Sequence, residues 1–260
     1  MAANLSIWRM LCVCAAALLA SCAPVAERGP VILAPASMQE AMEALADAWE
    51  AQGHPRPVLS IAGTPAIARQ AAEGAPADLI VTADSEWMDW LEERGHTSPA
   101  SRRVVAGNSL VFVWSDMHLA VPGRPTVAEV DFAPRHIAMA DPDTVPAGRY
   151  ARRALESAGL WDGISGRIVP TEDVRAALRL VERGEVDLGV VYASDVRAVA
   201  SLLSAPLPGG ESVTVRYPAA LAAASTHPDA AGLLDFLSAP EGAVILCAHG
   251  FTAPSDETLC

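Results

Sequence analysis

Lysine is absent from this chain of 260 residues, and all 18 basic residues are arginine. They are outnumbered by 31 acidic residues, so the formal charge at pH 7 is −13. Proteins that bind nucleic acid usually carry an excess of positive charge, because they must neutralise phosphates. The charge therefore argues against a nucleic-acid partner. Any anionic ligand would have to be held by local dipoles, since bulk attraction has the wrong sign.

Aromatic residues are also scarce, at 5% of the chain, whereas hydrophobic residues make up 52%. The core must therefore rest on alanine, valine, leucine and isoleucine. The chain is long enough to bury such a core in one large domain or in two lobes.

The motifs of several enzyme classes are missing. The sequence has no Gly-x-Ser-x-Gly elbow, no His-Glu-x-x-His pair and no phosphate-binding loop. The histidines are not spaced like metal ligands, and no Cys-x-x-Cys pair occurs. Several acidic residues could be imagined as paired carboxylates, although no pattern brings them together: Asp78, Asp84, Asp141, Asp143, Glu172 and Asp173. The sequence therefore predicts neither a catalytic residue nor a cofactor.

The N-terminus has the order of a secretory signal. Arg9 is the only charge before an apolar run over 10–20, and this run is shorter than the roughly 20 residues that span a bilayer. Leu19-Ala20-Ser21-Cys22 follows and resembles a bacterial lipobox. We expect residues 1–21 to be a signal peptide, Cys22 to carry the lipid and residues 22–29 to form a tether. The alternative is an ordinary cleaved signal with a chance cysteine.

Two cysteines remain once the signal and a lipidated Cys22 are set aside. Cys247 and Cys260 could form a disulfide in an oxidising compartment and fix the C-terminal tail, or they could stay free. The sequence leaves both possibilities open.

Strands and helices alternate along the chain after the tether. Apolar runs at 30–34, 57–61 and 78–82 predict buried strands, and each precedes a helical pattern. The expected helix starts are a capping box at Ser37 to Glu40, a Thr64 cap with Pro65 as the first helical residue, and a Ser85 cap. Such alternation predicts an α/β fold with mostly parallel sheets flanked by helices.

The pattern changes near Asn108 and begins again further on. The run 109–114 predicts a strand that leaves the first lobe, and 127–130 and 135–139 open a second α/β unit. Residues 174–181 repeat apolar positions at helical spacing, and 187–192 form a buried strand that ends on Tyr192. A strand over 213–217 is expected to return to the first lobe. We therefore assign residues 30–109 and 216–260 to lobe 1 and residues 110–215 to lobe 2.

Helix starts after strands offer a specific chemistry. Each helix N-terminus presents unpaired N–H groups and about half a positive charge. Several such ends that converge form an anion site without a buried cation, which suits an acidic protein. Taken by themselves, however, Ser37, Thr64 and Thr171 could equally be simple caps.

A series of segments in order along the mature chain resembles the periplasmic molybdate-binding proteins of ABC importers. The likeness runs from about Val31 to Phe251, so it covers nearly the whole mature chain. The segments that carry it are Ala34-Pro-Ala-Ser37, Ala68-Arg-Gln70, Gly74-Ala-Pro-Ala-Asp78-Leu79, Ala83-Asp84, Trp87-Met88, Gly107-Asn-Ser-Leu110, Asp141-Pro142, Val145-Pro-Ala-Gly148, Tyr150-Ala151, Glu172-Asp-Val-Arg175, Leu188-Gly-Val-Val-Tyr192 and Ser194-Asp195.

This resemblance implies a two-lobed periplasmic binding protein fold of type II, with an oxyanion in the cleft between the lobes. Ser37 and Thr64 would donate hydroxyl hydrogen bonds, Ala147 and Val174 would donate backbone N–H groups, and Tyr192 would donate its phenol O–H. Any metal contact would run through the oxyanion's oxygens alone. Pro65 and Pro35 depart from the family pattern, and Pro65 removes one backbone donor.

The implied ligand is molybdate or tungstate, between which the sequence does not choose. The implied partners are an ABC permease and its ATPase, with a monomeric protein anchored to the membrane through Cys22 in the periplasm. The function would be reversible capture by lobe closure, without catalysis. The alternatives are a binding protein for another oxyanion or a small organic acid, a periplasmic enzyme on the same scaffold, and a sensory lipoprotein.

Overall fold

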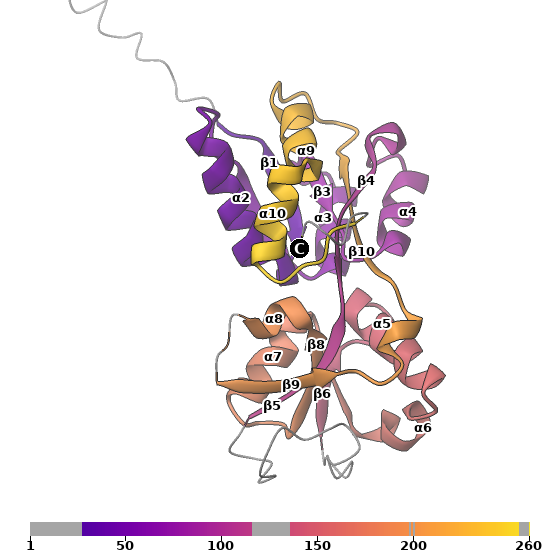
Figure 1. The fold of residues 1–260 in the computed structure, drawn as a ribbon. Helices are drawn as coiled ribbons and strands as arrows, with labels where there is room; N and C mark the ends of the chain where they lie inside the picture. The colour runs from indigo at the N-terminus through magenta and orange to yellow at the C-terminus, as the bar shows by residue number, and fades with distance from the viewer. Residues whose placement is uncertain (1–27, 116–135, 198, 200, 255–259) are drawn as a thin grey trace, which may run out of the picture.

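The computed structural model describes residues 28–115, 136–197, 199, 201–254 and 260. The predicted signal peptide, the lipid site at Cys22 and the expected element at 127–130 lie outside these residues. The described chain forms two lobes, one above the other in Figure 1, and each lobe is built on its own five-stranded sheet.

The first lobe contains the sheet β2-β1-β3-β10-β4, covered by helices on both faces. Only β10 runs against the other four strands, because it pairs antiparallel with both of its neighbours. The elements of this lobe are β1 (Val31–Pro35), the 3-10 turn η1 (Ala36–Met38), α2 (Gln39–Ala51), β2 (Val58–Ala62), α3 (Thr64–Ala72), β3 (Leu79–Val81), α4 (Ser85–Glu93), η2 (Pro99–Ser101), β4 (Arg103–Asn108), β10 (Val215–Leu221), α9 (Ala230–Ser238) and α10 (Pro240–Ala248).

The second lobe repeats this arrangement. Its sheet has the order β7-β6-β8-β5-β9, and β5 is the one strand that opposes the rest. The elements of this lobe are β5 (Leu110–Ser115), β6 (Ile137–Ala140), α5 (Pro146–Ser157), α6 (Trp161–Ile164), η3 (Ser165–Arg167), β7 (Ile168–Thr171), α7 (Val174–Glu182), β8 (Leu188–Tyr192), α8 (Ala193–Arg197), β9 (Leu202–Pro206) and η4 (Gly210–Ser212). The expectation of two lobes with mostly parallel sheets is confirmed.

Burial explains why these segments became strands and helices. The central strands β3, β6 and β8 are buried at every residue, as expected for strands with helices on both faces. Helix α7 buries Val174, Ala177, Leu178 and Val181, the helical stripe that the sequence predicted. The core is therefore made mainly of aliphatic side chains, with few aromatic residues among them.

The chain crosses between the sheets at two places. The first crossing joins β4 directly to β5 at Ser109, and the second joins β9 to β10 through η4. The sequence placed the returning strand at 213–217, but β10 starts at Val215 and continues through Pro218 to Leu221. Proline fits inside this strand because the register shifts between Tyr217 and Pro218, as in a β-bulge.

Three of the expected helix caps are wrong in detail. Ser37 lies inside η1 and makes no cap, and Thr64 is the first residue of α3, with Gly63 before it as the N-cap. Helix α4 is capped by Asp84, which accepts the N–H of Trp87 at 2.9 Å, and Ser85 is its first helical residue. Ser37 and Thr64 hydrogen-bond to distant parts of the chain, so their hydroxyls do not serve the helix ends.

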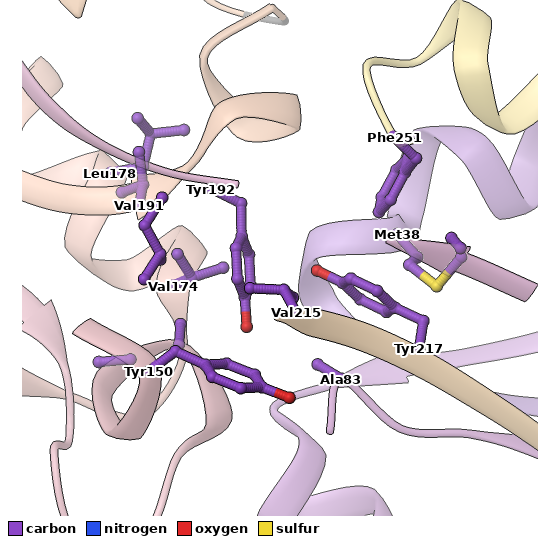
Figure 2. Packing of buried hydrophobic residues seen from close by; sticks show 14 of the residues in the cluster. Met38, Ala83, Tyr150, Val174, Leu178, Val191, Tyr192, Val215, Tyr217 and Phe251 are labelled. Atoms are coloured by element: carbon purple, nitrogen blue, oxygen red, sulfur yellow. The ribbon is translucent and has the colours of Figure 1, made fainter. Parts of the chain in front are cut away.

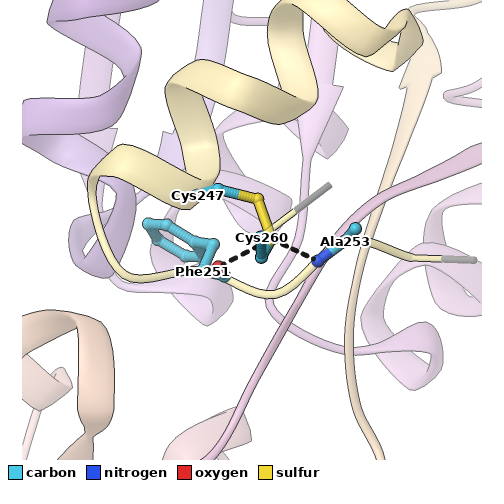
Figure 3. Close-up of a disulfide and its surroundings, with 4 residues drawn as sticks. All are labelled: Cys247, Phe251, Ala253 and Cys260. Atoms are coloured by element: carbon cyan, nitrogen blue, oxygen red, sulfur yellow. Dashed lines mark hydrogen bonds between the residues drawn. A yellow bond between two sulfur atoms is a disulfide. The ribbon is translucent and has the colours of Figure 1, made fainter. Parts of the chain in front are cut away.

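The C-terminus is tied back to the first lobe. Cys247 of α10 and Cys260 form a disulfide with their Cα atoms 5.3 Å apart (Figure 3). The structure therefore answers the question that the sequence left open. Within the described residues, no single helix is both long and apolar enough to cross a membrane, and α9 and α10 reach that length and composition only as a pair bent by 63°.

Candidate functional site

A small cavity lies between the lobes, where the carboxyl ends of several strands meet helix starts. Its lining includes all five residues predicted from the sequence: Ser37, Thr64, Ala147, Val174 and Tyr192. The cavity volume is about 20 Å³, little more than one water molecule needs. The site therefore suits a compact inorganic group in this closed form.

Ser37 enters the cavity from the turn that follows β1. The residue is buried, and its Oγ lies 3.1 Å from the phenol oxygen of Tyr217 in β10. The hydroxyl is therefore held by a side chain 180 positions away, at the boundary between the lobes.

Thr64 stands at the start of α3. Its Oγ1 accepts the backbone N–H of Ala83 at 3.2 Å, which leaves its own hydrogen free to point elsewhere. The N–H of Thr64 has no partner within the helix because of its place in the first turn. Pro65 is the next residue and supplies no N–H, as the sequence indicated.

The second lobe presents two more helix starts. Ala147 is the second residue of α5 and Val174 is the first residue of α7. Asp173 caps α7 by accepting the N–H of Ala176 at 2.8 Å, and Asp141 Oδ1 accepts the N–H of Thr144 at 2.9 Å in the turn before α5. Both turns are fixed by these carboxylates, so the N–H groups behind them are held in place.

Tyr192 closes the cavity from the end of β8. Its side chain is fully buried, yet its hydroxyl has no hydrogen-bond partner among the described residues. Figure 2 shows this hydroxyl directed away from β8, past Val174. Burial raises the pKa of the Tyr192 phenol well above its usual range, so the group is a neutral O–H. Such a buried, unpaired donor costs free energy unless a ligand accepts from it.

Asp195 supports Tyr192 from behind, and the sequence reasoning gave it no role. Its Oδ2 accepts the N–H of Tyr192 at 3.1 Å, and its Oδ1 lies 2.7 Å from Nε of Arg175. Arg175 also reaches Glu40 across the cleft, with Nη1 3.0 Å from Oε1. Arg175 and Asp195 both lie in segments that carry the family resemblance. That resemblance assigned neither residue a function.

Titration of Asp195 should be visible in the stability of the protein. Burial raises the pKa of Asp195 to about 7, against the opposing effect of Arg175. Between about pH 4 and pH 7 the folded protein then keeps a proton that the unfolded chain has released, so this residue's contribution to stability falls as pH rises. The slope is at most about 1.4 kcal/mol per pH unit.

We expect Asp195→Asn to remove that slope. Urea denaturation at pH 5, 6 and 7 would show the free energy of unfolding falling more steeply with pH in the wild type than in the variant. Parallel pH profiles for the two proteins would contradict the raised pKa of Asp195.

The lobes are in contact on both sides of the cavity. Arg175 of α7 pairs with Glu40 of α2 on one side, and Arg149 of α5 pairs with Asp84 beside α4 on the other. Arg149 and Arg153 of α5 also pair with Glu86 of α4. We call the Arg175–Glu40 and Arg149–Asp84 contacts the two rim ion pairs. They join helices of opposite lobes, so the cavity is described here in its closed state.

At the mouth of the cavity the two lobes touch through their backbones. Gly63 lies against the segment before α7, and a Cβ at this position would stand 2.7 Å from the carbonyl oxygen of Glu172. A side chain at residue 63 would therefore meet the opposite lobe.

The cavity offers neutral hydrogen-bond donors. Among the described residues no arginine lines it, and the lining offers two hydroxyls, a phenol and backbone N–H groups at helix starts. The one charged lining residue is Asp173, whose Oδ1 accepts the N–H of Ala176 in the cap of α7. Within the described part of the chain, no group of three or more His, Cys, Asp or Glu side chains could hold a metal ion. The arrangement can bind a small anion by hydrogen bonds and helix dipoles.

Comparison with known proteins gives a consistent result. The family model described as "Bacterial extracellular solute-binding protein" matches residues 30–252. The chain is 35% identical to the molybdate-binding protein ModA of Escherichia coli over 234 residues, which covers 88% of this chain and 91% of that protein. It is 32% identical to ModA of Haemophilus influenzae over 233 residues, with 85% and 89% covered. The resemblance seen in the sequence is thereby confirmed.

Solved structures share the fold at lower identity. The periplasmic molybdate-binding protein of Azotobacter vinelandii superposes with a TM-score of 0.75 at 24% identity, covering 87% of this chain and all of that one. The sulfate-binding protein SubI of Mycobacterium tuberculosis gives 0.76 at 18% identity, covering 90% and 89%. These likenesses establish the two-lobed fold.

Proposed function

We propose, from the premise that this chain belongs to the bacterial extracellular solute-binding proteins, that its solute is the tetrahedral oxyanion molybdate or tungstate. The two relatives at 35% and 32% identity are both molybdate-binding proteins. The observation that carries the proposal is the Tyr192 hydroxyl, which is fully buried beside the cavity without a partner. A ligand oxygen would supply the missing acceptor.

The donor set explains why an oxyanion fits. Ser37, Thr64 and Tyr192 would donate O–H groups, and Ala147 and Val174 would donate N–H groups from the helix starts. Hydrogen bonds to a charged group contribute about 1.5–3 kcal/mol each, roughly twice a neutral one. A dianion with four equivalent oxygens can accept from several directions at once. The small volume of the cavity supports such a ligand over a sugar or an amino acid.

The same geometry supports capture by closure without catalysis. The donors come from both lobes, so the anion would bind one lobe first and draw the other onto it. The moving units would be residues 30–109 with 216–260 and residues 110–215, because the chain crosses between the sheets after β4 and before β10. Among the described residues, no histidine or carboxylate is hydrogen-bonded to the hydroxyls of Ser37, Thr64 or Tyr192.

Delivery requires partners in the membrane. We propose that the closed, loaded monomer is recognised by an ABC permease with its ATPase, as expected for this family of extracellular binding proteins. A lipid on Cys22 would hold the protein at the membrane surface in the periplasm, with residues 23–29 as a tether. Support for the anchor comes from the sequence Leu19-Ala20-Ser21-Cys22 alone.

Thermal unfolding with four anions tests the ligand class. A ligand at about 100 times its dissociation constant adds roughly 2.7 kcal/mol of stability, which is several degrees of melting temperature for a chain of this size. We expect molybdate and tungstate to raise the melting temperature of the form that starts after Cys22, and sulfate and phosphate to leave it unchanged. A shift with sulfate alone would replace the proposed ligand. No shift with any anion in folded protein would refute the oxyanion function.

A further inference from the structure

A buried chain of polar groups runs from the cavity to the first crossing between the lobes. Ser37 Oγ lies 3.1 Å from the phenol oxygen of Tyr217, and that oxygen lies 3.4 Å from Nδ2 of Asn108. Nδ2 of Asn108 also donates to Ser194 Oγ at 2.8 Å. Asn108 is the last residue of β4, and Ser194 stands beside Asp195 in the second lobe. These hydrogen bonds therefore connect Ser37, a predicted ligand residue, to the crossing at Asn108 and Ser109, which we call the hinge.

The backbone of the hinge determines which atom donates in each of these hydrogen bonds. The N–H of Ser109 donates to Oδ1 of Asn108 at 2.9 Å, which requires the carbonyl side of the amide to face Ser109. The NH₂ side must then face Tyr217 and Ser194. Because an amide nitrogen can only donate, the phenol oxygen of Tyr217 accepts from Asn108.

The next hydrogen bond in the series is donated by Tyr217 to Ser37. Tyr217 has one hydroxyl hydrogen, and Ser37 Oγ is the remaining hydrogen-bond partner of its phenol oxygen among the described residues. The Tyr217 side chain is fully buried, and burial raises the pKa of its phenol, so the proton stays on the oxygen. Ser37 Oγ therefore accepts from Tyr217, and the hydrogen of Ser37 is left for the cavity. Figure 2 shows the Tyr217 ring reaching from β10 towards the same region as Tyr192.

Thr64 is arranged in the same way by a different group. Its oxygen accepts the N–H of Ala83, so its hydrogen is also left for the cavity. Both hydroxyls of the first lobe therefore have their hydrogen available to donate to a ligand.

We infer that Tyr217, oriented by Asn108, is a positioning residue that commits the hydrogen of the Ser37 hydroxyl to the ligand. This inference rests on the proposed function, because it assigns a direction to one of the proposed donors. Tyr217 does not touch the ligand and acts only through Ser37.

A double-mutant cycle isolates this action. Tyr217→Phe keeps the ring and removes the hydroxyl, so Ser37 can turn its hydrogen away from the ligand. We expect this variant to bind molybdate about 5- to 10-fold more weakly in titration calorimetry, the equivalent of one neutral hydrogen bond. In a Ser37→Ala background the same change should cost less than about 2-fold.

A second variant reverses the direction without changing the packing of Tyr217. Asn108→Asp replaces the donating amide by a group of the same shape that accepts, so Tyr217 donates to it and Ser37 must donate to Tyr217. Its added negative charge weakens binding in both backgrounds. The reversed hydrogen bond can weaken binding only while Ser37 is present. Asn108→Asp should therefore lower the affinity about 5-fold more in the protein with Ser37 than in the Ser37→Ala background.

Thr97→Val serves as the control. It removes another buried hydroxyl of the first lobe and keeps the shape of the side chain, but Thr97 does not line the cavity and its hydroxyl has no hydrogen-bond partner among the described residues. Its affinity should match that of the wild type. Tyr217→Phe should lower the unliganded melting temperature by a few degrees, because it removes two buried hydrogen bonds.

The possible outcomes distinguish a failure of the Tyr217 role from a failure of the proposed oxyanion function. Wild-type protein that binds molybdate, with losses that are equal in the two Ser37 backgrounds or shared by Thr97→Val, would overturn the positioning role of Tyr217 alone. Wild-type protein that binds none of the four anions would overturn the proposed function and this inference together.

Discussion

Tyr192→Phe is expected to weaken molybdate binding by roughly 10- to 100-fold, because it removes one hydrogen bond to a charged ligand, worth about 1.5–3 kcal/mol. The hydroxyl is the one side-chain donor that the second lobe contributes to the predicted set. Its loss should therefore act mainly on the closed state, and it should appear as faster release of the anion.

The same substitution should not damage the fold. The unliganded hydroxyl is buried without a partner, so removing it leaves no unsatisfied group behind. We expect the unliganded melting temperature to stay the same or to rise slightly. Titration calorimetry and thermal unfolding of both proteins give the two numbers. Unchanged affinity would remove Tyr192 from the site, and a large drop in the unliganded melting temperature would assign it a structural role.

Gly63→Val should abolish tight binding by keeping the lobes apart. The backbone of Gly63 has φ −58° and ψ 141°, an extended conformation that valine adopts readily, so no strain arises inside the first lobe. The Cβ would stand 2.7 Å from the carbonyl oxygen of Glu172 in the second lobe, and a branched side chain cannot withdraw from that contact. The obstruction therefore exists only when the cleft closes.

The size of the effect follows from the population of the closed state. If the obstruction lowers that population 100-fold, the apparent affinity falls by the same factor, and we expect a loss of about this order. The unliganded protein should keep its melting temperature, because the open form avoids the contact. Calorimetry of Gly63→Val beside Gly163→Val, at a position in α6 where no atom would meet the added Cβ, provides the measurement and its control. Normal affinity of Gly63→Val would mean that the bound state is more open than the structure shown here.

The sequence predicted the architecture well for a physical reason. Buried strands such as β8 and the apolar stripe of α7 are local patterns, and local patterns determine which segments form strands and helices. The ends of the elements were less predictable. Ser37 and Thr64 have the chemistry of caps, but partners far along the chain engage both hydroxyls.

The residues of the site were also predictable only in part. Ala147 and Val174 contribute through their backbone, so their side chains give no chemical signal, and only the resemblance to a known family identified them. Tyr217 and Asn108 were not predicted as functional, because their contacts join residues 86 to 180 positions apart. No local spacing in the sequence could reveal such contacts. The three-dimensional structure was needed to show that the hydroxyls of the site have a fixed direction.

The two rim ion pairs have a consequence for how this protein can evolve. Glu40, Arg175, Asp84 and Arg149 hold the closed form together without contributing to the five-residue donor set. A substitution of Glu40 or Arg149 shifts the balance between open and closed molecules equally for every ligand. Natural variation at the rim can thus adjust the working concentration range to the local supply of the solute, while the choice among solutes stays with the interior.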